Sequence, residues 1–247
     1  MPAVFVHGVP DTHRVWHPVV SRLDRKDVVT LSLPGFDSPL PEGFNATKEA
    51  YADWLLEQLN ALPKPLDIVG HDWGAILVLR AVSVQPDIAQ SWAVGGAPID
   101  SRYVWHQAAQ MWQTPEVGEQ VMQAMTPEAI QAALTQGGVP GLDAAETAKY
   151  VDNTMKDCIL KLYRSAINVG AEWEKDLARI AAPGLVLWGD EDPYVKPSFG
   201  VYLAERTRSK FVSFLDCAHW WQLQQPEEVV IELRKLWNPS EDSFWPS

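Results

Sequence analysis

The run from Leu66 to Leu79 constrains the fold of this chain more than any other stretch. Residues 66–69 are mostly apolar and predict a short strand, residues 70–74 read Gly-His-Asp-Trp-Gly, and the apolar run after them predicts a helix. Glycines on both sides of one reactive side chain are typical of a nucleophile elbow, where the backbone is strained and larger neighbours would clash. The reactive position, which usually holds serine, holds Asp72.

The same alternation of strand and helix continues along the chain. Apolar runs typical of strands buried on both faces occur at residues 3–6, 28–33, 91–97, 184–189 and 210–215. Helical spacing of apolar residues occurs at 14–23, 47–62 and 227–237, and residues from Asn238 onward resemble a loose tail. Strand–helix–strand units predict a mostly parallel sheet with right-handed crossovers, here of six strands in an α/β fold.

One long segment departs from this pattern. Residues 98–182 are helical in character, rich in Ala, Gln and Met, and contain no convincing strand. Pro115, Pro127 and Gly137-Gly138 divide the segment into short helices. We therefore predict an α/β core made of residues 1–97 and 183–247, which carries a helical cap of residues 98–182.

Composition excludes several classes of partner. The 247 residues include 20 Lys+Arg against 32 Asp+Glu, a formal net charge of −12, so nucleic acid and anionic membranes are poor candidates. Cys158 and Cys217 are far apart and lack metal-ligand spacing, which favours reduced thiols in an intracellular protein. We find no signal-peptide pattern and no apolar stretch of about 20 residues, so we expect a cytoplasmic protein outside the membrane.

Four landmarks follow one another in the sequence, each at the end of a predicted strand. They are His7-Gly8-Val9-Pro10, the elbow, Gly189-Asp190-Glu191-Asp192 and Cys217-Ala218-His219-Trp220. In these landmarks the chain resembles the α/β-hydrolase superfamily, and specifically the capped branch of epoxide hydrolases and haloalkane dehalogenases. The resemblance implies an α/β-hydrolase fold and chemistry without a metal or cofactor. Relatives usually have two strands before the His-Gly strand, so we expect that sheet edge to be missing and a homodimer as one way to cover it.

The resemblance also assigns roles to residues. Asp72 would be the nucleophile, His219 the base that activates water, and Asp192 the acid that orients the imidazole. The backbone N–H groups of Val9 and Trp73 would form the oxyanion hole. Because Asp192 adjoins two other carboxylates, a solvated acidic loop stays open as an alternative. An aspartate nucleophile forms an alkyl ester, so the expected substrate is an epoxide or an alkyl halide.

The leaving group decides between the two activities. An epoxide oxygen needs a proton donor, and Leu162-Tyr163-Arg164-Ser165 resembles the cap Tyr-Arg element of epoxide hydrolases, which makes Tyr163 the candidate. The second tyrosine of that family aligns with Met111, so His106 or Tyr103 is a hypothesis for the second donor. We expect small, neutral, apolar substrates, which react with water.

A halide needs N–H donors instead. Trp73 could serve as one, and Trp105 or Trp112 as the other, although Val9 stands where many dehalogenases have Asn. We expect a substrate pocket lined by four tryptophans: Trp73, Trp105, Trp112 and Trp220. Epoxide hydrolysis is the leading hypothesis, haloalkane dehalogenation is the alternative, and a ligand-binding pseudoenzyme on the same scaffold is the third.

Overall fold

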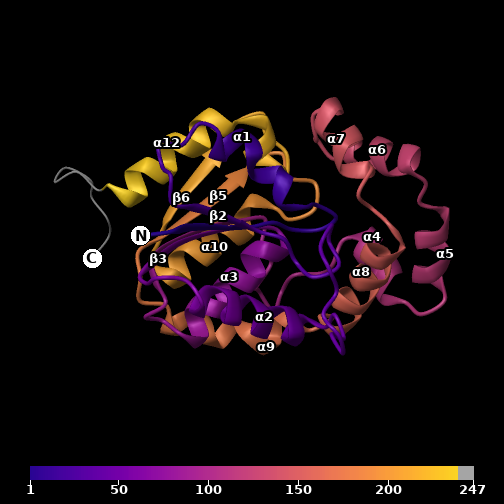
Figure 1. Ribbon diagram of the computed structural model, residues 1–247, viewed down its shortest axis with the longest axis horizontal. Helices are drawn as coiled ribbons and strands as arrows, with labels where there is room; N and C mark the ends of the chain where they lie inside the picture. Colours follow the sequence, from indigo (N-terminus) through magenta and orange to yellow (C-terminus); the bar gives the residue numbers. More distant parts are fainter. Residues whose placement is uncertain (239–247) are drawn as a thin grey trace.

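The computed structural model describes residues 1–238, and the predicted tail beyond Asn238 lies outside them (Figure 1). Its centre is a six-stranded sheet in the order β2-β1-β3-β4-β5-β6, and all five pairings are parallel. The predicted α/β-hydrolase sheet of six strands is therefore confirmed. The strands are β1 (Ala3–Val6), β2 (Val28–Leu31), β3 (Leu66–His71), β4 (Ala89–Gly95), β5 (Gly184–Gly189) and β6 (Lys210–Phe214).

Burial of the strands follows their order in the sheet. Every residue of β1, β3 and β5 is buried, as expected for strands covered on both faces. The edge strand β2 is half-buried, and it pairs with β1 in a register that sets Phe5 beside Thr30. Phe5 also pairs with Val69 of β3, so the first landmark and the elbow begin at neighbouring strand ends.

Helices cover both faces of the sheet (Figure 1). The contacts group α1 (His17–Val20), α11 (Trp221–Gln224) and α12 (Pro226–Trp237) on one face, after the 3₁₀ turn η1 (His13–Trp16). On the other face lie α2 (Lys48–Asn60), α3 (Trp73–Val84) and α10 (Pro197–Thr207). Helix α2 begins where the sequence predicts, because the Thr47 hydroxyl accepts a hydrogen bond from Ala50 N–H.

The cap is a group of short helices at one end of the molecule (Figure 1). It contains α4 (Gln107–Gln113), α5 (Val117–Ala124), α6 (Pro127–Gln136), α7 (Gly141–Ala148) and α8 (Asn153–Ser165). Thr126 caps α6 through a hydrogen bond from Ala129 N–H, directly before the predicted break at Pro127. Asp152 caps α8 in the same way.

The last part of the predicted cap packs on the core instead. Helix α9 (Val169–Trp173) and the 3₁₀ helix η2 (Glu174–Arg179) lie under α2 and α3 (Figure 1). Lys48 of α2 pairs with Glu172 at 2.8 Å, and Arg80 of α3 pairs with Asp176. The cap helices therefore end at Ser165, earlier than the predicted boundary at residue 182.

The structure also bears on the two cysteines and on the membrane. Cys158 and Cys217 are both buried free thiols. Within residues 1–238 we find no helix with the length and apolar character needed to cross a bilayer.

Candidate active site

The elbow holds Asp72 between β3 and α3 in a strained conformation. Asp72 has φ +52° and ψ −123°, outside the regions that most residues adopt. A Cβ added to Gly74 would lie 2.2 Å from the Val6 carbonyl oxygen, and one on Gly70 would lie 2.6 Å from the Gly74 carbonyl oxygen. The glycines are thus required by close backbone packing, which holds the turn at the carboxyl end of β3.

The Asp72 carboxylate is held from one side by backbone N–H groups. Val9 N–H donates to Oδ1 at 3.0 Å, which leaves Oδ2 free of that bond. Burial raises the pKa of Asp72 to about 6, against the opposing effects of the His219 charge and of the Val9 and Trp73 N–H groups. The two groups that the resemblance assigns to an oxyanion hole therefore both stabilise the ionised carboxylate.

His219 is hydrogen-bonded to Asp192 at the ends of two neighbouring strands. Its Nδ1 lies 2.7 Å from Asp192 Oδ2, while Asp192 Oδ1 accepts N–H bonds from Tyr194 at 2.8 Å and Val195 at 2.9 Å. Burial lowers the pKa of His219, but Asp192, Asp72 and Asp11 outweigh it and raise the value to about 8. Of the three adjacent carboxylates, Asp192 is the one that bonds the imidazole, and this geometry leaves Nε2 free.

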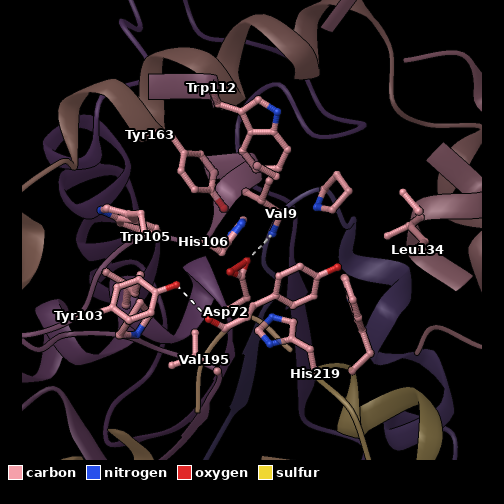
Figure 2. Close-up of a pocket in the computed structure, with 18 of the residues that line it drawn as sticks. Val9, Asp72, Tyr103, Trp105, His106, Trp112, Leu134, Tyr163, Val195 and His219 are labelled. Carbon is pink, nitrogen blue, oxygen red and sulfur yellow. Dashed lines mark hydrogen bonds between the residues drawn. The ribbon is translucent and has the colours of Figure 1, made fainter. Parts of the chain in front are cut away.

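A cavity of about 140 Å³ lies between these residues and the cap. Asp72 and His219 line it, together with apolar residues of α6, Ile130 and Leu134 among them (Figure 2). None of its described lining residues is Lys or Arg. The cavity is therefore suited to a neutral, mostly apolar molecule placed against Asp72.

Tyr163 supplies a hydroxyl to this cavity. It comes from α8, is 3% exposed, and its hydroxyl points toward Asp72 (Figure 2). Burial and the charge of Asp72 raise the pKa of Tyr163 well above the ordinary value, so the phenol keeps its proton. Tyr163 can therefore donate a hydrogen bond where charge develops beside Asp72.

The two candidates for a second donor differ in their bonding. Tyr103 donates its hydroxyl to the Tyr194 carbonyl at 3.1 Å, so its proton is already engaged (Figure 2). His106 lines the cavity, and its Nδ1 accepts the Ala109 N–H at 3.3 Å at the start of α4. Burial lowers the pKa of His106 to about 4, so the ring is neutral and its proton resides on Nε2. Met111 is not among the described lining residues.

Three of the four expected tryptophans line the cavity. These are Trp105, Trp112 and Trp220, whereas Trp73 is fully buried and stacks on Trp105 with ring centroids 6.0 Å apart. The structure thus corrects the expectation for the Trp73 side chain, because Trp105 and Tyr163 pack over it. Trp105 N–H donates to the Ile167 carbonyl at 3.2 Å, and the Trp112 nitrogen lies on the far side of its ring from Asp72 (Figure 2).

Some residues at the site carried no recognisable signal in the sequence. Tyr194 packs edge-on against His219, with centroids 5.2 Å apart, and also lines the cavity. Asp11 is buried and accepts a hydrogen bond from Trp220 Nε1 at 3.0 Å. His7, in the first landmark, bonds the Gly8 carbonyl and accepts the Leu33 N–H, which orders the loop that carries Val9. Within residues 1–238 no cluster of three or more His, Cys, Asp or Glu side chains is arranged to hold a metal.

The parallel sheet, the elbow and the cap together define a class of protein, the α/β hydrolases. The sequence profile of the alpha/beta hydrolase family matches residues 3–233, and the chain belongs to that family. Among curated proteins, epoxide hydrolase 3 of Xenopus tropicalis is 22% identical over 263 residues, which cover 92% of this chain and 68% of the relative.

Solved structures agree with this assignment at the level of the fold. A haloalkane dehalogenase from Bradyrhizobium elkani superposes with a TM-score of 0.78 at 19% identity, over 94% of this chain and 88% of that chain. A meta-cleavage product hydrolase from Pseudomonas fluorescens superposes with a TM-score of 0.81 at 18% identity, over 96% of this chain and 90% of that chain. These likenesses establish the fold, and the choice of substrate rests on the site.

Proposed function

We propose that this hydrolase opens epoxides to vicinal diols through a covalent ester on Asp72. The observation that carries the proposal is the Tyr163 hydroxyl, which is buried, protonated and directed at Asp72 across an apolar cavity (Figure 2). An epoxide oxygen becomes an alkoxide as its ring opens, and a proton donor at that position stabilises the developing charge. The similarity to an epoxide hydrolase supports the same reaction.

In the first step the free Oδ2 of Asp72 attacks one carbon of the epoxide. The C–O bond of the ring breaks, and Tyr163 donates its proton to the departing oxygen, which leaves a phenolate on Tyr163. Val9 N–H stays on Oδ1, 3.0 Å away, which orients the carboxylate for attack through its other oxygen. The product of this step is an alkyl ester of Asp72 with a free hydroxyl on the neighbouring carbon.

In the second step water cleaves the ester. His219 Nε2 takes a proton from water, and the hydroxide attacks the carboxyl carbon of Asp72. Negative charge develops on the carboxyl oxygen held by Val9 and Trp73 N–H groups, so the groups that hold the resting carboxylate also stabilise this tetrahedral intermediate. Asp192 keeps the imidazole oriented and stabilises its positive charge through the 2.7 Å bond. The bond between the carboxyl carbon and Oδ2 then breaks, the diol leaves with the former Asp72 oxygen and the proton of the added hydroxyl, and the proton on His219 returns to the Tyr163 phenolate.

Isotope labelling tests the ester mechanism directly. In a single turnover in ¹⁸O-water with enzyme in excess over a styrene oxide-type substrate, the diol receives its new oxygen from Asp72. We expect unlabelled diol in the first turnover and label in Asp72, followed by labelled diol in later turnovers. Immediate label in the first diol would mean direct attack by water and would refute the proposal.

A variant that stops after the first step gives an independent test. His219→Gln removes the base but leaves Asp72 and Tyr163 in place, so the ester should accumulate and add the mass of the substrate to the intact protein. A matched Asp72→Asn, His219→Gln double variant should show no such addition. If neither epoxides nor haloalkanes modify the single variant, the chain is better explained as a ligand-binding pseudoenzyme.

Haloalkane dehalogenation is the second candidate. The Trp73 indole N–H has no hydrogen-bond partner among residues 1–238, which favours a role as a halide donor, but Trp105 and Tyr163 pack against its ring. Trp105 N–H is engaged by Ile167, and the Trp112 nitrogen lies away from Asp72 (Figure 2). Halide release from bromoalkanes, without diol formation from epoxides, would reverse the order of the two candidates.

A further inference from the structure

Asp11 is a buried carboxyl group that the proposed reaction does not use. It lies just beyond β1, is 1% exposed, and is not among the described residues that line the cavity. Its Oδ2 accepts the indole N–H of Trp220 at 3.0 Å. Because Trp220 follows His219 directly in the sequence, this bond connects the loop after β1 to the loop that carries the catalytic histidine.

His71, the last residue of β3, contacts the His219 loop, and this contact fixes the tautomer of its ring. Its Nε2 lies 2.9 Å from the His219 carbonyl oxygen, and since a carbonyl only accepts, Nε2 carries the proton. Burial and the charge of His219 lower the pKa of His71 well below the ordinary value, so the ring is neutral. Nδ1 therefore presents a lone pair, and it has no hydrogen-bond partner among residues 1–238.

That lone pair faces Asp11. His71 Nδ1 lies 3.9 Å from Asp11 Oδ2, too far for a hydrogen bond but close enough for repulsion between a lone pair and a charged carboxylate. A proton on Asp11 removes the repulsion and the cost of a buried negative charge. The geometry around Asp11 thus favours its neutral, protonated form.

The charged surroundings of Asp11 act in both directions. Burial and the charge of Asp72 together raise the pKa of Asp11 to about 7, against the opposing effects of the Trp220 bond and the charge of His219. Tyr194 also faces this group and stays protonated, because burial raises its pKa. In turn, the charge of Asp11 is one of the causes that raise the pKa of His219.

We propose that Asp11 is a positioning residue: it holds the His219 loop through the hydrogen bond that it accepts from Trp220, is a neutral acid in the resting enzyme below neutral pH, and on ionising makes His219 bind its proton more tightly. The functional part of this inference rests on the proposed role of His219 as the base. Asp11 would then set the pH at which His219 becomes free to accept a proton from water.

Asp11→Asn is the variant that separates charge from structure. Asparagine has nearly the same shape, and its carbonyl oxygen at the position of Oδ2 can still accept the Trp220 N–H. The His219 ring is titrated by NMR without substrate, with its signals assigned by their loss in His219→Gln, so the result does not depend on which reaction the enzyme catalyses. Asp37→Asn, at an Arg14-paired carboxyl on the loop after β2, is the control for an equal change in net charge.

We expect the pKa of His219 to fall by about one unit in Asp11→Asn and to stay unchanged in Asp37→Asn, because the charge of Asp11, unlike that of Asp37, is among the causes that raise it. We also expect the infrared spectrum of the wild type at pH 6 to show a protonated carboxylic acid band that Asp11→Asn lacks. A His219 titration that is identical in Asp11→Asn and wild type would overturn the proposal. Absence of the acid band at pH 6 would show that Asp11 is already ionised and would also overturn it.

Discussion

The choice between the two candidate reactions is made by single side chains around Asp72. Tyr163 offers a free hydroxyl, whereas the Tyr103 hydroxyl is bonded to the Tyr194 carbonyl and the Trp105 N–H is bonded to the Ile167 carbonyl. Both tyrosines line the cavity, so replacing each by phenylalanine removes one hydroxyl oxygen from the same site and gives a matched comparison.

We expect Tyr163→Phe to lower the rate of ester formation from epoxides by about 10²-fold or more, the usual contribution of a positioned general acid. Tyr103→Phe should change that rate much less, because its proton is directed at the backbone. Rapid-quench measurement of the ester in both variants checks this. If Tyr163→Phe forms the ester at the wild-type rate, Tyr163 is not the proton donor. His106 Nε2–H would then be the remaining candidate donor.

At the same scale, the sequence could indicate only those residues that belong to local patterns. Asp72, His219 and Asp192 follow strand ends, and the structure brings them together as the spacing of those strands requires. Asp11 meets Trp220 across 209 positions of sequence, and no local pattern marks a contact of that kind. Trp73 shows a second limit of sequence patterns. Its position beside the nucleophile was recognised, but the pattern did not predict the direction of its side chain.

Among the elements, the end of the cap was the boundary that sequence did not locate. Residues 98–182 contain no strand, and helical periodicity alone does not distinguish a helix of the cap from one on the core. Trp173 of α9 shows why the distinction matters physically: it is 6% exposed and lies between Arg80, 5.0 Å from its ring centroid, and Lys48, at 5.7 Å. Cation–π contact and burial therefore fix α9 to α2 and α3.

This placement predicts a large effect on core stability. Trp173→Ala should lower the free energy of unfolding by about 3–5 kcal/mol, the usual cost of removing a buried tryptophan. Leu142→Ala, at an 89% exposed position on α7, should change it by less than about 0.5 kcal/mol. Urea denaturation of the two variants makes the comparison, and a cost below about 1 kcal/mol for Trp173→Ala would contradict the assignment of α9 to the core.

On the scale of the whole molecule, the fold brings several acidic side chains together around His219, where water has little access to them. The chain carries a formal net charge of −12, and three of its acidic groups lie around one histidine: Asp11 and Asp192, which are buried, and Asp72, which is half-buried. The strand order brings them together, because the loops after β1, β3, β5 and β6 all open at the carboxyl edge of the sheet. The pH dependence of catalysis is therefore a property of this assembly of loops.

Two different pH profiles follow for the two chemical steps. Ester formation needs ionised Asp72, and since burial raises the pKa of that carboxyl to about 6, kcat/KM should fall about tenfold per unit as pH drops below that value. Ester hydrolysis needs neutral His219, whose pKa of about 8 in the resting enzyme includes a contribution from the charge of Asp72. Once Asp72 is an ester this contribution is lost, so the limb in kcat should lie below 8.

Stopped-flow and steady-state measurements from pH 4 to 10 separate the two limbs. A kcat/KM limb near the ordinary aspartate value of about 4 would mean that the nucleophile is not the buried carboxyl of Asp72.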